Sequence, residues 1–270
     1  MSEALPEHDP FAIEDRVAVV TGTATGVGRG IAEHFARAGA KVLLGDVAAE
    51  AGRAVADGLA AEGLETDFVA GDVSDPEAAK SLIDTAVERW GSLDILMNNA
   101  AIQVEKTLED TEPEEWERLM SVNLRGVYAC SRPAIPAMRA SGGGSIINMA
   151  SVNGFWVEPG LAAYCAAKGG VINLTRAIAL ENGRYQIRCN CICPGYIDTG
   201  MAQRYFEIQD DPEAAREVAG KMHALGRVGK PEEVAAMALF LCSDEASFCT
   251  AQPFIVDGGL SAGVSAGPDL

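Results

Sequence analysis

Short apolar segments alternate with helical segments along almost the whole chain, and this alternation limits the possible folds more than any other feature. Patterns typical of buried strands occupy residues 16–21, 41–46, 66–70, 93–98, 145–149, 186–193 and 253–257. Helical patterns occupy residues 26–38, 48–62, 76–90, 113–139, 160–181, 213–222 and 231–242. Strands that alternate with helices form parallel sheets through right-handed crossovers. The sequence therefore predicts an α/β protein with a doubly wound, seven-stranded parallel sheet and helices on both faces.

The chain contains no linker, repeat or low-complexity break, so we predict a single domain at residues 15–262. A flexible acidic N-terminal tail at 1–14 and a C-terminal tail at 263–270 should flank it. Residues 196–227 contain no predicted strand, and a helical insertion beyond the carboxyl end of a strand is a candidate substrate lid. Pro133 and Pro136 should kink the helix predicted at 113–139 or mark its end.

Charge and hydropathy exclude several classes of partner. Lys and Arg number 21 against 39 Asp and Glu, which gives a formal net charge of −18. A protein this acidic repels phosphate backbones, so we expect no nucleic acid partner. No apolar run approaches the ~20 residues of a membrane span, and the N-terminus lacks the apolar core of a secretory signal. We therefore expect a cytoplasmic protein without membrane association.

The seven cysteines do not indicate a disulfide framework, because their number is odd and no targeting segment is present. Cys189, Cys191 and Cys193 alternate along a predicted strand and so share one face, where they pack as small apolar residues. The sequence has neither zinc-ligand spacing nor a histidine partner for these thiols. We therefore predict no metal site.

A glycine-rich turn joins the first predicted strand to the first predicted helix. Its glycines let the backbone approach a pyrophosphate, whose charge is met by the helix N-terminus. The spacing G-x-x-x-G-x-G differs from the generic dinucleotide fingerprint G-x-G-x-x-G, although its place between strand and helix is the same. The residues of this turn that we assign to the cofactor are Gly22, Thr25, Gly26, Val27 and Gly28. The alternative is a glycine-rich turn that binds no ligand.

Polar residues close the next three strands on the same side of the sheet. A carboxylate at Asp46 can bind the hydroxyl groups of an adenine ribose and repels a 2′-phosphate, which favours NAD(H) over NADP(H). Asp72, followed by Val73, can accept a hydrogen bond from the adenine amino group. Asn99 and Ala100 complete the predicted cofactor edge, although Asn side chains at strand ends also have purely structural roles.

Tyr164 and Lys168 are four residues apart on the helix predicted at 160–181 and share a face. The lysine cation favours the phenolate and should lower the pKa of Tyr164 from its usual value of ~10, so that the phenol transfers protons near neutral pH. Ser151 follows the fifth strand, where its hydroxyl can donate to a substrate carbonyl oxygen. Asn123 is a polar residue in an apolar helical segment, where its side chain either bends the helix or binds a water molecule.

The order of these motifs resembles that of the single-domain short-chain dehydrogenase/reductases, from about Arg16 to Leu260. The matching motifs are Thr-Gly-x-x-x-Gly-x-Gly from Thr21, Asp72-Val73, Asn98-Asn99-Ala100, the set Asn123, Ser151, Tyr164 and Lys168, Pro194-Gly195 with Thr199, and the stretches 226–235 and 256–259. The resemblance implies a Rossmann-type fold and a nicotinamide cofactor.

The resemblance also implies a role for each residue of the set. Tyr164 would be the general acid/base, and Lys168 would lower its pKa and hold the nicotinamide ribose. Ser151 would orient the carbonyl or carbinol, while Asn123 would position a water that links Lys168 to solvent. At the nicotinamide end of the cofactor, the implied residues are Pro194, Gly195, Ile197 and Thr199.

Two positions depart from the family pattern. Ala101 stands where Gly usually follows Asn-Asn-Ala, and Ala251 stands where Gly usually precedes the last strand. Neither belongs to the catalytic set. Ala101 is expected to restrict a backbone turn close to the nicotinamide.

The sequence thus predicts an NAD(H)-dependent oxidoreductase that transfers a hydride between nicotinamide and a small-molecule secondary alcohol or ketone. Two alternatives stay open, a 3-oxoacyl-(carrier protein) reductase and a non-catalytic NAD-binding regulatory protein. Asp46 and the acidic charge argue against the first, and the complete catalytic set argues against the second. The resemblance further implies a homotetramer, with the helices at 113–139 and 160–181 between subunits.

Aromatic residues near the predicted lid favour an apolar, cyclic or aromatic substrate, although they can equally pack the lid itself. These aromatics are Phe155, Trp156, Tyr196, Tyr205 and Phe206. The residues that we assign to substrate binding are Ser151, Asn153, Trp156, Tyr164 and Tyr196.

Overall fold

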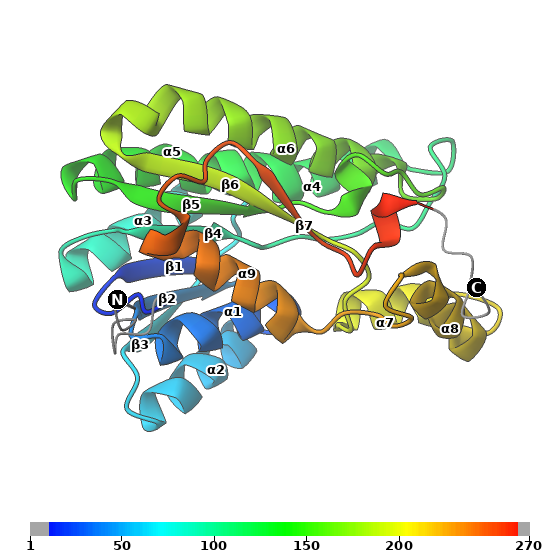
Figure 1. Cartoon of the computed structure of the whole chain (residues 1–270), viewed down its shortest axis with the longest axis horizontal. Coiled ribbons are helices and arrows are strands. Elements are labelled where there is room, and N and C mark those ends of the chain that lie inside the picture. Colours follow the sequence, from blue (N-terminus) through cyan, green and yellow to red (C-terminus); the bar gives the residue numbers. More distant parts are fainter. Residues whose placement is uncertain (1–10, 264–270) are drawn as a thin grey trace, which may run out of the picture.

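The computed structural model describes residues 11–263, and it contains the predicted sheet of seven parallel strands (Figure 1). The strands are β1 (Val17–Thr21), β2 (Lys41–Asp46), β3 (Thr66–Ala70), β4 (Ile95–Asn98), β5 (Gly144–Met149), β6 (Ile187–Pro194) and β7 (Pro253–Val256). Their order is β3-β2-β1-β4-β5-β6-β7, so the winding reverses between β1 and β4. In such sheets, ligands bind beyond the carboxyl ends of the strands at the reversal point.

Helices cover both faces of the sheet. They are α1 (Gly26–Arg37), α2 (Ala49–Ala61), α3 (Pro76–Trp90), α4 (Pro113–Met120), α5 (Gly126–Ala140), α6 (Ala162–Asn182), α7 (Gly200–Glu207), α8 (Pro212–Met222) and α9 (Pro231–Cys242). One face packs against α1, α2 and α9 and the other against α3, α5 and α6, as Figure 1 shows. This arrangement confirms the doubly wound fold predicted from the sequence.

Each face of the sheet has its own apolar core. Val20 and Leu44 belong to the core that contains Phe35 of α1, whereas Val19 and Leu43 belong to the core on the side of α3. All of these side chains are fully buried. Because neither face meets solvent, the strands consist of nearly continuous apolar runs without polar alternation.

The single helix predicted at 113–139 is wrong in one respect. One π-helical turn, Ser121–Arg125, separates α4 from α5, whereas Pro133 and Pro136 lie inside α5 without ending it. Neither proline is buried, and each removes only one helical hydrogen bond, so the helix continues through both positions. The wide turn is centred on Asn123, and such turns often mark functional positions.

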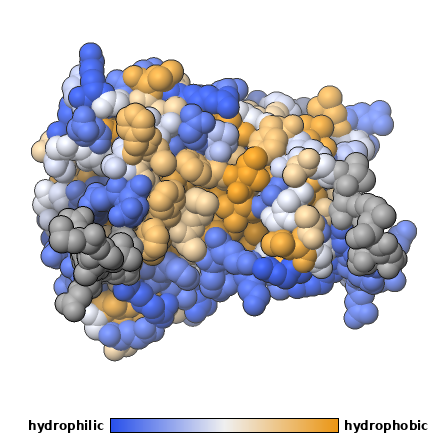
Figure 2. Space-filling view, viewed as in Figure 1, coloured by the Kyte–Doolittle hydropathy of each residue, from blue (hydrophilic) through white to orange (hydrophobic). Residues whose placement is uncertain are grey.

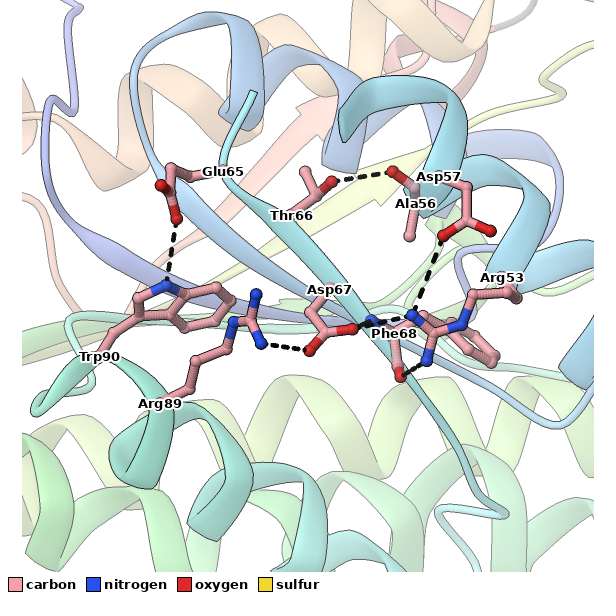
Figure 3. A network of polar contacts seen from close by, with 9 residues as sticks. All are labelled: Arg53, Ala56, Asp57, Glu65, Thr66, Asp67, Phe68, Arg89 and Trp90. Carbon is pink, nitrogen blue, oxygen red and sulfur yellow. Dashed lines mark hydrogen bonds and ion pairs between the residues drawn. The ribbon is translucent and has the colours of Figure 1, made fainter. Parts of the chain in front are cut away.

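Asp67 of the edge strand β3 connects the two helical layers (Figure 3). Its carboxylate binds Arg53 of α2 at 2.8 Å and Arg89 of α3 at 2.9 Å. The Arg53 guanidinium also lies 5.4 Å from the centre of the Phe68 ring. Partial burial acts to raise the pKa of Asp67, but the hydrogen bond from Arg53 and the two cations lower it overall. These ion pairs therefore tie the edge strand β3 to a helix on each face of the sheet.

The ordered domain begins before residue 15. Ile13 is completely buried, and its N–H donates to the Ala38 carbonyl at 3.1 Å. The rest of the predicted N-terminal tail, residues 1–10, and the C-terminal residues 264–270 lie outside the described part of the chain.

Cys189, Cys191 and Cys193 of β6 are buried, as the alternation predicted. Residues 11–263 contain no cluster of potential metal ligands, and no helix in this range has the length and hydropathy needed to cross a membrane. Figure 2 shows apolar side chains gathered on the face across which α9 and β7 run, and Ile255 of β7 is 49% exposed. An exposed apolar face of this kind is typical of a contact surface between proteins.

Candidate active site

A cavity of about 350 Å³ lies at the carboxyl ends of the central strands. It brings together most of the predicted site residues: Gly22, Thr25, Gly26, Val27, Gly28, Asp46, Asn99, Ala100, Ser151, Asn153, Trp156, Tyr164, Lys168, Pro194, Gly195, Tyr196, Ile197 and Thr199. Three predicted residues, Asp72, Val73 and Asn123, are not among those that line it.

The glycine-rich turn has the backbone that a closely approaching ligand requires. Gly22 and Gly26 have φ angles of +72° and +61°, a region that glycine enters without strain. A Cβ atom on Gly28 would lie only 2.0 Å from the Gly22 carbonyl oxygen. The turn therefore depends on glycine at these positions, and it leads directly into the N-terminus of α1, where an anion is stabilised.

Asn99 fixes this turn from the neighbouring strand. Its Nδ2 atom donates to the carbonyl oxygens of Thr21 at 3.0 Å and Gly22 at 3.1 Å. The backbone N–H groups of Asn99 and Ala100 donate to the Thr21 hydroxyl at 3.0 and 3.1 Å. The Asn99 side chain thus has the structural role that the sequence left open, although the residue also lines the cavity.

Asp46, the last residue of β2, is hydrogen-bonded to the glycine-rich turn. One carboxylate oxygen accepts from Ala24 N–H at 2.9 Å and the other from Ala48 N–H at 2.9 Å. These bonds fix the carboxylate where it lines the cavity, with lone pairs left for further donors. A carboxylate with free acceptor positions beside the glycine-rich turn suits a ligand group that carries hydroxyl donors next to a pyrophosphate.

Asp72 is engaged elsewhere. Its carboxylate accepts from Ser74 N–H and pairs with Arg118 of α4, both at 2.9 Å. Val73 is buried and lies against Gly126, where a Cβ atom in place of the glycine hydrogen would come within 2.8 Å of a Val73 methyl group. The pair thus connects the end of β3 to the α4–α5 region, and its contact with the adenine stays a prediction.

Lys168 is fully buried next to Tyr164. Its Nζ atom donates to the Met149 carbonyl oxygen at 2.7 Å. Burial lowers the pKa of Lys168 to about 8, while the nearby thiols of Cys193 and Cys191 act in the opposite direction. The amine therefore titrates close to neutral pH.

The expected pKa direction for Tyr164 is wrong for this structure. Burial raises the pKa of Tyr164 to about 12, and a hydrogen bond with Ser151 only partly offsets this effect. Desolvation of the phenolate is the largest cause, and the neighbouring Lys168, with Nζ 5.4 Å from the centre of the ring, does not reverse it. The phenol is accordingly a proton donor at rest, and the reaction needs a further stabilising charge to form the phenolate.

Ser151 and Asn153 lie together beyond β5. The Ser151 hydroxyl oxygen accepts from Asn153 N–H at 3.1 Å and is hydrogen-bonded to Tyr164. The Oδ1 atom of Asn153 is buried, lacks a hydrogen-bond partner among the described residues and belongs to a residue that lines the cavity. A buried acceptor without a partner is costly unless a ligand supplies a donor.

Asn123 acts from outside the cavity. Its Oδ1 atom accepts from Ile102 N–H at 2.9 Å, and its Nδ2 atom donates to the Ile102 carbonyl at 2.8 Å. The side chain thus attaches the π-helical turn to the loop after β4, which carries Ala100 and Ala101. Each amide atom uses one of its two hydrogen-bonding positions in this way, so one donor and one acceptor remain, and the water between Asn123 and Lys168 stays a prediction.

The two departures from the family pattern differ in conformation. Ala251 has a φ of +64°, a left-handed backbone that suits the glycine usual at this position. Ala101 is not among the described non-glycine residues with positive φ, so it carries no such strain.

Among the cavity residues that the sequence reasoning missed, Glu158 is the one with a carboxylate. Its carboxylate lines the cavity and accepts hydrogen bonds from the Tyr196 and Tyr205 hydroxyls at 2.5 and 2.8 Å. Its position between Ser151 and Tyr164 was the available signal. Of the predicted aromatics, Phe155 is 48% exposed and Phe206 of α7 is buried, and neither lines the cavity.

A doubly wound sheet whose reversal point carries a glycine-rich turn, a buried Tyr–Lys pair and a serine defines a Rossmann-fold oxidoreductase. The sequence profile of a family described as enoyl-(acyl carrier protein) reductase matches residues 22–261. A crystal structure of a short-chain type dehydrogenase/reductase from Mycobacterium marinum superposes with a TM-score of 0.87 at 32% identity, covering 94% of this chain and 99% of that one. The chain belongs to the short-chain dehydrogenase/reductase family.

Two curated relatives are similar over almost their full length. A cyclohexanol dehydrogenase from Acinetobacter sp. is 37% identical, over 92% of this chain and 96% of that protein. An NADP-dependent (R)-specific alcohol dehydrogenase from Lentilactobacillus kefiri is 38% identical, over 93% of this chain and 98% of that protein. Membership of this family makes the protein a nicotinamide-dependent oxidoreductase.

Proposed function

We propose that the protein is an NAD(H)-dependent oxidoreductase that interconverts a small secondary alcohol and its ketone, with an apolar or cyclic carbon skeleton. The observation that carries the proposal is the meeting of Tyr164, Lys168 and Ser151 in the same cavity as the glycine-rich turn. The alcohol dehydrogenases among the relatives support the reaction class.

Tyr164, Ser151 and Lys168 each have a separate role in the proposed reaction. The Tyr164 hydroxyl gives its proton to the substrate oxygen during reduction and takes it back during oxidation. Ser151 holds that oxygen by a hydrogen bond, and the Lys168 amine stabilises the phenolate while it holds the ribose. The bound nicotinamide supplies or accepts the hydride. The set therefore handles the proton and positions both reactants.

The preference for NAD(H) rests on Asp46. Its carboxylate disfavours a 2′-phosphate, and the cavity residues of the glycine-rich turn include no Lys or Arg to attract one. Arg29, the nearest candidate along the chain, is paired with Glu33 at 2.8 Å. The Lentilactobacillus relative is NADP-dependent, so the cofactor must be tested for this chain itself.

A carrier-protein reductase is the second candidate, because the matching family profile is described as an enoyl-(acyl carrier protein) reductase. An acyl carrier docks through basic residues in such enzymes, and the net charge of −18 opposes an acidic partner. A non-catalytic NAD-binding protein would have no chemical need for the complete catalytic set. The alcohol dehydrogenase is therefore favoured.

The test is a dehydrogenase assay with a panel of linear and cyclic secondary alcohols, each with NAD⁺ and with NADP⁺. We expect formation of reduced nicotinamide with NAD⁺ and at least one alcohol of the panel. Binding of NAD⁺ without turnover of any member would instead favour the non-catalytic protein, and turnover only of acyl-carrier thioesters would favour the second candidate.

We further propose a homotetramer in the cytoplasm. Exposed apolar side chains on the expected contact helices, Tyr128 of α5 at 50% and Leu180 of α6 at 82%, support self-association. Light scattering coupled to size exclusion would measure four times the chain mass of 28.2 kDa; a monomer or a dimer would refute the tetramer.

A further inference from the structure

A carboxylate lies at the substrate end of the cavity, and the proposed proton transfer does not use it. Glu158 belongs to the loop between Ser151 and Tyr164, and its Oε1 atom accepts from the hydroxyls of Tyr196 at 2.5 Å and Tyr205 at 2.8 Å. Tyr196 follows β6 and Tyr205 lies on the lid helix α7, so three separate segments meet at this oxygen. All three residues line the cavity.

The cluster of Glu158, Tyr196 and Tyr205 offers acceptors and no donors. Both phenol hydrogens point to the same carboxylate oxygen, so the phenol oxygens have only lone pairs left for other partners. Burial, and then the hydrogen bond to Glu158, raise the pKa values of both phenols, which keeps them protonated. Oε2 of Glu158 is an acceptor as well.

The cluster is not neutralised from within the chain. Among the described residues, the polar partners of Glu158 are the two phenols, and the cation Arg204 that lines the same cavity is not paired with it. A half-buried carboxylate is stabilised by donors and strongly so by cations. The cluster therefore suits a ligand group that is a hydrogen-bond donor, and it repels carboxylate and phosphate groups.

We propose that Glu158, with Tyr196 and Tyr205, recognises a second hydrogen-bond donor on the substrate, so that the preferred substrates are diols or amino alcohols. The proposal rests on the proposed function and narrows its substrate class. A carbon ring or chain packs against Trp156 and Leu161, one hydroxyl meets Tyr164, and the second polar group meets the cluster.

The test compares kcat/KM for cyclohexanol with kcat/KM for the 1,2-, 1,3- and 1,4-cyclohexanediols and for 2-aminocyclohexanol. In the wild type, at least one difunctional substrate should exceed cyclohexanol by about tenfold or more, since a hydrogen bond to a charged group is worth that factor. Glu158→Gln replaces one carboxylate oxygen by a donor, so this ratio should fall to about one.

Glu207→Gln is the matched control, because it removes the same charge from α7 outside the cluster and should keep the wild-type ratio. If the diols are the better substrates of the wild type, Glu158→Gln should lower kcat/KM for the diols and for 2-aminocyclohexanol by similar factors. If 2-aminocyclohexanol is the better substrate, its kcat/KM should fall by the larger factor, because the variant also removes the charge pair with the ammonium group. Both results support the proposal. The proposal would be overturned if the wild type used cyclohexanol as well as the difunctional substrates, or if Glu158→Gln kept the wild-type preference. Glu158 would then only hold α7 in place through Tyr205.

A binding measurement that needs no turnover distinguishes failure of this proposal from failure of the proposed function. Calorimetry of the Tyr164→Phe variant with NAD⁺ measures the dissociation constants of cyclohexanol and the diols without turnover. A diol that binds about tenfold more tightly supports recognition by the cluster even if no alcohol is oxidised by the wild type. Equal dissociation constants refute it even if cyclohexanol is oxidised well.

Discussion

The amine of Lys168 is held by the backbone of Met149, the last residue of β5, at 2.7 Å. Because Ser151 follows two residues later and Tyr164 lies one helical turn before Lys168, this bond connects the strand end that leads to Ser151 with the helix that carries Tyr164 and Lys168. Nζ keeps two further hydrogens for the cofactor ribose and the phenolate. The same burial that fixes the amine lowers its pKa to about 8.

This lowered pKa makes the stability of the protein depend on pH. The folded value of about 8 lies below the unfolded value of 10.5, so the unfolded chain binds more protons between these limits. The free energy of unfolding should therefore rise with pH in this window. Relative to Lys168→Met, we expect the wild type to gain about 2 kcal/mol between about pH 7.5 and 9.5.

Denaturant titrations of both proteins at the two pH values measure this gain, and the difference between them cancels the other titrating groups. A difference that does not change with pH would mean that the amine is solvated in the folded state. In activity assays, Lys168→Met should raise KM for the cofactor and lower kcat together, because the amine serves both the ribose and the phenol.

Tyr164→Phe should abolish proton transfer while it leaves the cavity intact. The change removes one buried oxygen, so we expect kcat to fall by a factor of about 10² to 10⁴ with little change in the cofactor dissociation constant. Steady-state rates and quenching of protein fluorescence by the cofactor provide the two measurements. Tyr185→Phe, at a partly buried tyrosine outside the cavity, is the control and should retain full activity. A near-normal kcat for Tyr164→Phe would show that another group transfers the proton.

Alternation and motif order were sufficient to predict the sheet, its strands and most residues of the cavity from the sequence. Boundaries differ by only one or two residues, because apolar strands and capped helices carry local signals. Local signals failed where distant contacts decide the outcome. The π-helical turn at Asn123 depends on Ile102, the pKa of Tyr164 depends on burial, and Glu158 acquires its role from tyrosines of two other segments.

Asp46→Ala should relax the cofactor preference. Without the carboxylate, repulsion of a 2′-phosphate and the bonds to the ribose hydroxyls are both lost, and the ratio of kcat/KM for NAD⁺ over NADP⁺ should fall by about tenfold or more. Assays with both cofactors on one alcohol measure the ratio. Asp57→Ala, on the exposed surface of α2, should leave it unchanged. An unchanged ratio for Asp46→Ala would exclude Asp46 as the ribose contact.

Asn123→Ala should weaken both the fold and the catalytic loop. It removes two hydrogen bonds to Ile102 and leaves a backbone donor and acceptor without partners, which should cost about 2 kcal/mol. Because the same loop carries Ala100 and Ala101 along the cavity, KM for the cofactor should rise as well. Thermal unfolding and cofactor kinetics measure the two effects. Asn173→Ala at the exposed surface of α6 should change neither by a measurable amount, and equal behaviour of the two variants would contradict the role of Asn123.

Ala251→Gly should stabilise the protein, although it removes a methyl group. Ala251 has a φ of +64°, a conformation that costs an L-residue about 1 kcal/mol and glycine almost nothing. We therefore expect the free energy of unfolding to rise by up to about 1 kcal/mol and Tm by about 2–4 °C. Ala101→Gly is the matched control, because this alanine also replaces a family glycine but has no positive φ. There, glycine only adds entropy to the unfolded chain and should lower stability. Denaturant unfolding of the two variants should give shifts of opposite sign, and a loss of stability in both would show that the Ala251 methyl group contributes more by packing than its backbone loses by strain.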